Sequence, residues 1–250
     1  MIVSDDGQEY VAESFCRQFY PWVRYTKGLQ KGPAANRNNG AKLAIGDWLV
    51  FTDDDCLPDS GWLKAYAEAI QQYPECKAFE GAILPDDWNL LKKDMAECPV
   101  NTEGGCFWSA NIMVKKELFF NIGGFDKEYI IAAREDQDLF YRLQGLTNIM
   151  FCKNVIVTHP VRFISFSKRM HMLKSRSENY LYFAQKNHRS LGFTSKKEII
   201  FKGGIMAQLR ALNKNLKSLK LKSSLINMYA IIAIYMPVYI KCFFSNETYS

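Results

Sequence analysis

The C-terminal third of the chain has few acidic residues, and this shortage is the clearest feature of its composition. Residues 161–250 contain 16 Lys and Arg but only three acids, Glu178, Glu198 and Glu247, for a net charge of +13. Residues 1–160 contain 16 Lys and Arg against 23 Asp and Glu, for a net charge of −7. Such an asymmetry indicates two regions with different partners. We therefore expect a folded domain over residues 1–160 and a basic helical tail over residues 161–250.

Motifs that would indicate several other classes of protein are also missing. The seven cysteines are odd in number and include no CxxC pair, so neither a zinc site nor a disulfide framework is predicted, and a reducing compartment is expected. The first ten residues carry acids in place of a basic, apolar leader, so we expect no secretory signal. The basic tail has no stacking-aromatic RNA motif, finger spacing or helix-turn-helix signal, and no nucleic-acid partner is expected.

Three consecutive acids, Asp53, Asp54 and Asp55, follow the short apolar run at residues 48–51. The run predicts a buried strand, and Pro58 prevents its continuation. Because adjacent carboxylates repel one another, a cation at this strand end would stabilise them. Mg²⁺ or Mn²⁺ suits the position, since hard cations prefer carboxylate oxygens. The alternative is a solvated acidic turn that precedes a helix near Asp59.

Short strands and helices are predicted to alternate along the first domain. We expect strands over 2–4, 22–26 and 47–52, and helices over 8–19, 32–44 and 59–72. This alternation is typical of an α/β sheet with crossover helices, in which ligands bind at the carboxyl ends of strands. The acids at 5–6 and at 53–55 both fall at such ends.

Four sequence blocks then occur in a specific order. They are Gly-Pro-Ala-Ala-x-Arg-Asn-x-Gly at 32–40, Asp-Asp-Asp-Cys-x-Pro at 53–58, Gly-Gly-Phe-Asp at 123–126, and Glu-Asp-x-Asp-Leu-x-x-Arg-Leu at 135–143. Together with the segment 104–116, they resemble the family-2 nucleotide-sugar glycosyltransferases over roughly residues 1–160. The resemblance implies a GT-A fold, a Rossmann-like mixed sheet flanked by helices. It also implies metal-dependent, inverting sugar transfer.

The resemblance assigns the chemistry to particular acids. Asp53 and Asp55 match the family's Asp-x-Asp motif for Mn²⁺ or Mg²⁺, with Asp55 as the direct ligand and Asp53 also near the nucleotide sugar. Asp136 matches the base that deprotonates the acceptor hydroxyl, and Glu135 would orient it or contact the acceptor. The alternative for these acids is that they favour the dipole of a helix that begins there, the role we expect for Asp138. His159 is a candidate metal ligand or diphosphate neighbour, or else a structural histidine.

Further positions carry binding roles by the same resemblance. Asp5 and Asp6 match the Asp-Asp-Gly turn that contacts the base or ribose, although Asp before Gly is also common in ordinary turns. Arg37 would face the base or the diphosphate. Trp108 could stack on an acceptor sugar, and a core tryptophan is the alternative.

The chain departs from the family pattern at its start. Family members place a strand and a helix before the Asp-Asp-Gly strand, whereas only four residues precede Asp5 here. One wall of the nucleotide pocket is therefore expected to be absent. Two alternatives stay open: a non-catalytic, membrane-bound remnant, and a nucleotidyltransferase, which also uses strand-end acids but would better fit a basic Gly-rich phosphate loop.

The tail has the composition of a membrane-surface segment. A helix is predicted near 163–188, and residues 196–222 interleave lysines with leucine and isoleucine, which favours an amphipathic helix on anionic headgroups. Residues 225–240 are mostly apolar but fall short of the ~20 that span a bilayer, so an interfacial or re-entrant helix is expected, with a dimerisation helix as the alternative.

These features together predict an enzyme of glycan or polysaccharide biosynthesis. Its donor would be a UDP-, GDP- or dTDP-linked sugar, and its acceptor a saccharide or lipid-linked saccharide. We expect it on the cytoplasmic face of a membrane.

Overall fold

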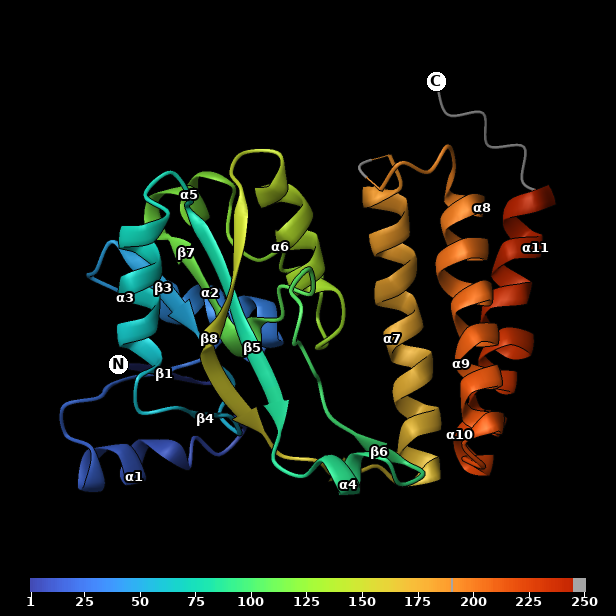
Figure 1. The fold of residues 1–250 in the computed structure, drawn as a ribbon, viewed down its shortest axis with the longest axis horizontal. Coiled ribbons are helices and arrows are strands. Elements are labelled where there is room, and N and C mark those ends of the chain that lie inside the picture. The colour runs from blue at the N-terminus through green and yellow to red at the C-terminus, as the bar shows by residue number, and fades with distance from the viewer. Residues whose placement is uncertain (190, 245–250) are drawn as a thin grey trace. The chain divides into compact units, whose positions relative to one another are not determined.

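The computed structural model describes residues 1–189 and 191–244 (Figure 1). Its internal packing divides the chain into two compact units, which we describe separately. Unit 1 comprises Met1–Asp86 and Pro99–Pro160, and unit 2 comprises Asp87–Cys98 and the chain from Val161 onward. The sequence pattern places residues 87–98 in the first domain, whereas in the structure they pack with unit 2.

Unit 1 contains the predicted alternation of strands and helices. Its strands are β1 (Ile2–Asp5), β2 (Arg24–Lys27), β3 (Trp48–Phe51), β4 (Leu57–Pro58), β5 (Ala78–Pro85), β7 (Ile112–Lys115) and β8 (Ile149–His159). Its helices are α1 (Ala12–Phe19), α2 (Pro33–Lys42), α3 (Trp62–Gln72), α5 (Lys116–Asn121) and α6 (Glu135–Gln144), with a short 3₁₀ turn η1 (Ser109–Asn111). The helices expected from residues 8 and 59 begin a few residues later than predicted.

The strands of unit 1 form a mixed sheet. Five of them lie in the order β3-β7-β5-β8-β4, and β5 pairs with β8 in parallel while the other neighbours are antiparallel. β1 and β2 pair in parallel as a separate two-stranded sheet. Figure 1 shows helices beside this sheet, which confirms the α/β fold class predicted from the sequence.

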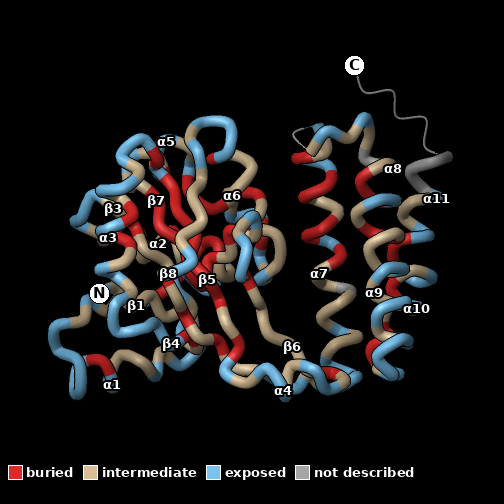
Figure 2. Tube along the Cα trace, in the orientation of Figure 1, coloured by how far each residue is buried: buried red, intermediate tan, exposed pale blue. Residues whose placement is uncertain are grey.

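Helices cover the sheet on both faces because its side chains alternate. Ile112 and Val114 of β7 pack in a cluster with residues of α2, α5 and α6. Met113, between them, packs in a second cluster with Tyr66 and Ala69 of α3. Since successive strand residues point to opposite faces, this alternation gives the three layers of the unit. Figure 2 shows the buried residues concentrated in these strands.

The side chain of Asn111 fills an irregularity between β5 and β8, whose register shifts inside β5. Its amide N–H groups donate to the carbonyls of Ala82 (2.8 Å) and Val155 (2.9 Å). Its carbonyl accepts from the Trp62 indole (2.8 Å) and the Tyr66 hydroxyl (2.9 Å). All four hydrogen-bonding positions of this buried amide are therefore used, which fixes α3 against the sheet.

Unit 2 is helical. Its elements are α4 (Trp88–Leu91), β6 (Ala96–Glu97), β9 (Arg162–Phe163), α7 (Phe166–Asn187), α8 (Lys196–Ile199), α9 (Met206–Lys217), α10 (Leu221–Tyr229) and α11 (Met236–Phe244), with π-helical turns η2 (Ile200–Ile205) and η3 (Ala230–Tyr235). The π turns join α8 to α9 and α10 to α11, so each pair forms one long helix. β6 pairs with β9, which holds residues 87–98 in this unit.

Two glycines let the π turns approach their neighbours closely. A Cβ at Gly204 would lie 2.7 Å from the Tyr235 ring, and one at Gly203 would lie 2.5 Å from the Tyr180 hydroxyl. Tyr180 and Tyr235 meet edge to face at 5.5 Å, and the Tyr180 hydroxyl donates to the carbonyl of Ile199 (2.7 Å). The glycines are thus required by packing.

The helix from Leu221 to Ile240 presents a large apolar surface to solvent. Its 20 residues have a mean hydropathy of 1.5, and a third of its most apolar stretch is buried inside the unit. By length and composition it could cross a membrane. Its exposed apolar side chains recur at helical spacing: Leu221, Leu225, Met228, Tyr229, Ile232, Met236 and Ile240.

Candidate active site

Arg37 of α2 joins two of the acidic motifs predicted from the sequence. Its Nη2 donates to Asp53 (2.8 Å) at the end of β3, and its Nη1 donates to Glu135 (2.9 Å) at the start of α6. Its guanidinium also lies over the Phe125 ring, 5.6 Å from the centroid. Burial lowers the pKa of Arg37, but the carboxylates of Asp53 and Glu135 raise it, with a net rise. The sequence pattern places Arg37 against a base or diphosphate; in this structure two carboxylates hold it.

The loop before α2 brings Arg37 to this position. The Asp6 carboxylate accepts from the backbone N–H groups of Gln30 (2.5 Å) and Gly32 (3.2 Å). Gly32 has φ +88°, and a Cβ there would lie 1.9 Å from the carbonyl of Ile130, so only glycine fits. Pro33 then opens the helix, as is common at the first helical position.

Asp5 has a similar local environment. It accepts from the backbone N–H of Gly7 (2.9 Å) and from the Tyr25 hydroxyl (3.1 Å). Burial, and then the hydrogen bond to Asp5, raise the pKa of Tyr25 to about 12. Both acids thus shape the turn after β1, and their contacts with a nucleotide stay predictions.

The Gly-Gly-Phe-Asp block is attached to α2 by a reciprocal pair of hydrogen bonds. The Asn38 amide donates to the carbonyl of Phe125 (2.7 Å) and accepts from its N–H (2.9 Å). A Cβ at Gly124 would lie 2.5 Å from Asn38 Oδ1, and Gly124 has φ +69°. The block therefore needs glycine because α2 packs directly against its backbone.

Asp136 lies next to this network. Its Oδ2 accepts from the backbone N–H of Ser109 (3.3 Å). Burial raises the pKa of Asp136 to about 7, the charge of Glu135 adds to the rise, and Arg37 opposes it. A carboxyl group that titrates near neutrality is suited to accept a proton in catalysis.

Glu135 is almost completely buried, and only half of its carboxylate is satisfied. Its Oε1 pairs with Arg37, while its Oε2 is buried and has no hydrogen-bond partner within residues 1–189 and 191–244. A buried polar atom without a partner is costly in a folded protein and marks a place where an additional group could bind.

Asp138 has a structural contact beyond its place in the first turn of α6. It is fully buried and accepts from Arg142 Nε (2.8 Å). Arg142 Nη1 in turn donates to the carbonyl of Ile122 (2.9 Å), which ties α6 to the turn before Gly123. The expected dipole role is therefore accompanied by an ion pair that the sequence did not predict.

The acids that follow β3 also contribute to a candidate metal centre. Ligand atoms of Asp55, Cys56 and His159 all lie within 4.8 Å of one another. His159 Nε2 is 3.5 Å from Asp55, and its Nδ1 is 2.9 Å from the carbonyl of Pro160. Because a carbonyl only accepts, Nδ1 carries the proton and Nε2 faces Asp55. Carboxylate and imidazole donors fit a divalent cation such as Mn²⁺.

The three strand-end acids thus face different surroundings. Asp54 is exposed, Asp53 meets Arg37 and Asp55 meets His159. The thiol of Cys56 was not among the predicted ligands, although its place directly after Asp55 was a visible signal.

Glu80 of β5 is a further buried carboxylate that sequence reasoning missed. It accepts from the backbone N–H groups of Gly105, Cys106 (3.2 Å) and Phe107 (2.7 Å), and from the Asn101 amide (3.1 Å). The loop at residues 104–107 therefore folds around one carboxylate. This loop leads to Trp108 and to Ser109, whose N–H reaches Asp136. An acid inside an otherwise apolar strand was the signal available in the sequence.

Trp108 is half-buried and packs against a small cluster formed by Cys56, Ile83, Ala110 and Val157. Its stacking on an acceptor sugar stays a prediction.

The chain is similar to known glycosyltransferases. The model of the family described as glycosyl transferase family 2 matches residues 1–118. The chain is 27% identical over 157 residues to an "Uncharacterized glycosyltransferase" of Haemophilus influenzae, covering 57% of this chain and 51% of that protein. It is 23% identical over 191 residues to the validoxylamine A glucosyltransferase of Streptomyces hygroscopicus subsp. jinggangensis, covering 58% and 44%. The chain spans about half the length of these curated relatives.

One solved structure shares the fold over nearly the whole chain. It is a mannosyltransferase from Pyrobaculum calidifontis in complex with GDP-Man and Mn²⁺, with a TM-score of 0.53 and 15% identity, covering 96% of this chain and 78% of that one. At this identity the likeness shows the fold alone, and it is the GT-A-like fold expected from the motifs. Over residues 1–118, the chain is thus similar to glycosyl transferase family 2.

Proposed function

We propose that unit 1 transfers a sugar from a nucleotide-sugar donor to a hydroxyl group of a saccharide or lipid-linked saccharide, in glycan or polysaccharide biosynthesis. One observation carries the proposal: Arg37 joins Asp53, at the strand end expected to hold the metal, to Glu135, beside a carboxyl group that titrates near pH 7. Donor-side and acceptor-side acids thus belong to one charged network.

Asp136 is the proposed base. It would accept the proton of the acceptor hydroxyl as that oxygen attacks the anomeric carbon. The new bond forms as the bond to the nucleoside diphosphate breaks, in one displacement that inverts the anomeric centre. Glu135, held by Arg37, would fix the start of α6 and thereby the position of Asp136.

Asp53, Asp55 and His159 are the proposed residues around a divalent cation, Mn²⁺ or Mg²⁺. The bound ion would offset the charge that the leaving diphosphate gains. The Pyrobaculum mannosyltransferase, whose structure contains Mn²⁺ with GDP-Man, supports this choice by its shared fold.

Calorimetric titration of the full chain with UDP, GDP and dTDP, each with and without Mn²⁺, tests the donor site. We expect one nucleotide to bind in a metal-dependent manner, and Asp55→Asn to weaken that binding at least about tenfold, the loss of one charged contact. Asp54→Asn, in an exposed neighbour, is the matched control and should change it less than about twofold. A folded protein that binds none of the three would support the non-catalytic alternative. In a separate assay with a nucleoside triphosphate and a sugar 1-phosphate, release of pyrophosphate with formation of a nucleotide sugar would indicate nucleotidyl transfer.

We also propose that unit 2 attaches the enzyme to an anionic membrane surface, on the cytoplasmic face. The exposed apolar side chains of α10 and α11 and the lysines of α9 support this. The test is co-sedimentation with vesicles: binding to vesicles with anionic lipid and weak binding to purely zwitterionic ones is expected. Equal failure with both would reject the proposal.

A further inference from the structure

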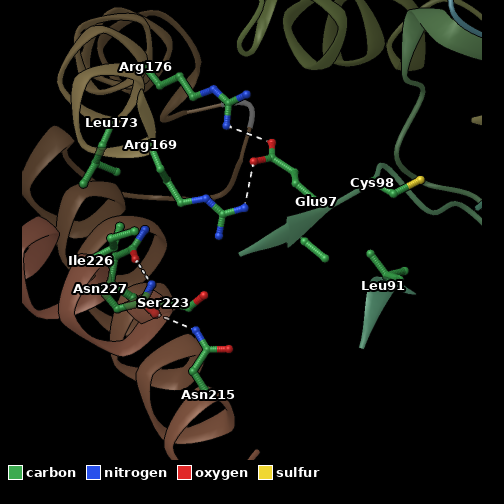
Figure 3. Close-up of a pocket in the computed structure, with 12 residues that line it drawn as sticks. Leu91, Glu97, Cys98, Arg169, Leu173, Arg176, Asn215, Ser223, Ile226 and Asn227 are labelled. Atoms are coloured by element: carbon green, nitrogen blue, oxygen red, sulfur yellow. Dashed lines mark hydrogen bonds and ion pairs between the residues drawn. The ribbon is translucent and has the colours of Figure 1, made fainter. Parts of the chain in front are cut away.

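Unit 2 contains a pocket of about 370 Å³, a size typical of small-molecule sites (Figure 3). Its polar end is formed by Arg169 and Arg176 of α7 and by Glu97 of β6. The two arginines lie seven residues apart, about two helical turns, so they project from the same face of the helix.

The charges at this end are unequal. Glu97 accepts from Arg169 Nη2 (3.1 Å) with one oxygen and from Arg176 Nη1 (3.2 Å) with the other, as Figure 3 shows. One carboxylate thus faces two guanidinium groups, which leaves one positive charge in excess. Arg169 Nε is buried and has no hydrogen-bond partner in the described part of the chain. An anion able to accept from it would satisfy both the charge and the donor.

The rest of the pocket is partly amide and partly apolar. The Asn215 amide donates to Asn227 (2.8 Å), and the Asn227 amide donates to Gln208 (2.6 Å), so these side chains are held in one chain of hydrogen bonds. Leu173 and Ile226 contribute apolar surface. An anionic group attached to an apolar body matches such a lining better than a bare inorganic ion does.

We propose that this pocket binds the phosphate monoester headgroup of a lipid. Phosphate oxygens match the fork of N–H groups that arginine presents, so the headgroup would lie against Arg169 and Arg176. The first carbons of the lipid would lie against Leu173 and Ile226. The pocket volume accommodates a headgroup and excludes whole acyl chains, which would extend into a bilayer. The inference rests on the proposed membrane attachment of unit 2 and is independent of sugar transfer.

Calorimetry on the full chain with dihexanoyl phosphatidate, a soluble lipid with a phosphate monoester, tests the site directly. Inorganic phosphate and dihexanoyl phosphatidylcholine are the comparison ligands. We expect the phosphatidate to bind at least about tenfold more tightly than either, since it alone combines the charge with the apolar body. Equal binding of inorganic phosphate would show an anion site without lipid preference and would overturn the lipid assignment.

Paired variants separate this site from general attraction to a basic surface. Arg169→Gln with Arg176→Gln should weaken phosphatidate binding about tenfold or more. Lys42→Gln with Lys64→Gln removes the same charge from exposed positions in unit 1 and should change it less than about twofold. Equal losses in the two double variants would overturn the proposal.

Glu97→Gln should increase the affinity for phosphatidate, a result that a misfolded variant would not give. Removing the competing carboxylate should tighten phosphatidate binding several-fold, and unchanged or weaker binding would contradict the proposed site. Binding of the soluble phosphatidate is measured without vesicles and without a sugar donor. If phosphatidate binds but the protein does not attach to vesicles, only the membrane proposal is rejected. Vesicle attachment without phosphatidate binding would reject the pocket alone.

Discussion

At the scale of single residues, Arg37 pairs with two carboxylates from separate parts of unit 1, Asp53 and Glu135. Its side chain is 17% exposed and that of its partner Glu135 is 3% exposed, so this ion pair is largely removed from water. Removing one partner of a buried pair leaves an uncompensated charge, which costs far more than the pair itself contributes.

Arg37→Gln should therefore lower the free energy of unfolding by about 3 kcal/mol at pH 8. Urea denaturation measures the change. Arg17→Gln, which breaks the exposed pair with Glu13, is the control and should cost less than about 0.5 kcal/mol. Adding Glu135→Gln to the Arg37 variant should restore part of the loss; a double variant that is less stable than the single one would contradict the account.

Asp136 should make both activity and stability depend on pH. A base with a pKa of about 7 is active only when deprotonated, so turnover should fall as the pH drops below 7. A pH–rate profile whose acid limb lies near pH 4 would contradict the raised pKa.

The effect of pH on stability is opposite to its effect on turnover: as the pH rises, turnover increases while the contribution of Asp136 to stability decreases. Below about pH 4 the carboxyl group is protonated in both the folded and unfolded states. Between pH 4 and 7 only the folded state keeps the proton, so this group's contribution to stability is lost as the pH rises through 7. Asp136→Asn should thus abolish transfer yet stabilise the fold at pH 8 by on the order of 2 kcal/mol, with little difference at pH 4. Thermal unfolding at the two pH values checks this, and equal gains at both would contradict it.

At the scale of elements, the loop at residues 104–107 depends on the carboxylate of Glu80. An amide can accept with only one atom, and its NH₂ would face N–H groups that cannot accept. Glu80→Gln should cost about 2 kcal/mol of stability and lower turnover, because Ser109 would no longer hold Asp136 in place. Chemical denaturation and a turnover assay measure the two effects. Glu75→Gln, at an exposed position, should change neither.

The adjacent glycines 123 and 124 form a natural comparison. Both have positive φ, but a Cβ at Gly123 would meet nothing within 4 Å, whereas one at Gly124 would collide with Asn38. Gly123→Ala should cost about 1 kcal/mol, the price of the left-handed backbone alone. Gly124→Ala should cost about 2–4 kcal/mol, because overpacking adds to that strain. Denaturation of both variants under the same conditions compares their free energies of unfolding. Equal costs would show that the Asn38 side chain moves aside freely.

At the scale of the whole molecule, the proposed attachment to membranes should depend on the apolar surface of α10 and α11. Ile232 is 67% exposed at η3, and Ile45 of unit 1 is 92% exposed. Ile232→Asp should reduce binding to anionic vesicles about tenfold, since it places a charge on the surface proposed to enter the interface. Ile45→Asp makes the same change elsewhere and should have little effect. Co-sedimentation compares them, and matching losses would favour general charge repulsion over a defined surface.

The sequence by itself determined the class of fold and the resemblance to family-2 glycosyltransferases. Apolar periodicity, the acids at strand ends and the spacing of the glycine blocks involve residues close together in the chain. For this reason the alternation of strands and helices over residues 2–72 could be predicted, apart from a few residues at helix ends, whereas the central strand β5 was not predicted. The same local pattern located the long helix α7 and the apolar stretch at 225–240.

Only the tertiary structure decided which side chains meet. Arg37 and Glu135 are 98 residues apart, and Asn38 and Phe125 are 87 apart. Likewise, residues 87–98 joined unit 2 through pairing of β6 with β9, which no local pattern announced. Glu80 could be seen as an unusual acid in a strand, but its partners could not. Such contacts depend on the path of the chain between the two residues. Where charged side chains such as Arg37, Glu135 and Asp136 are buried together, their pKa values shift.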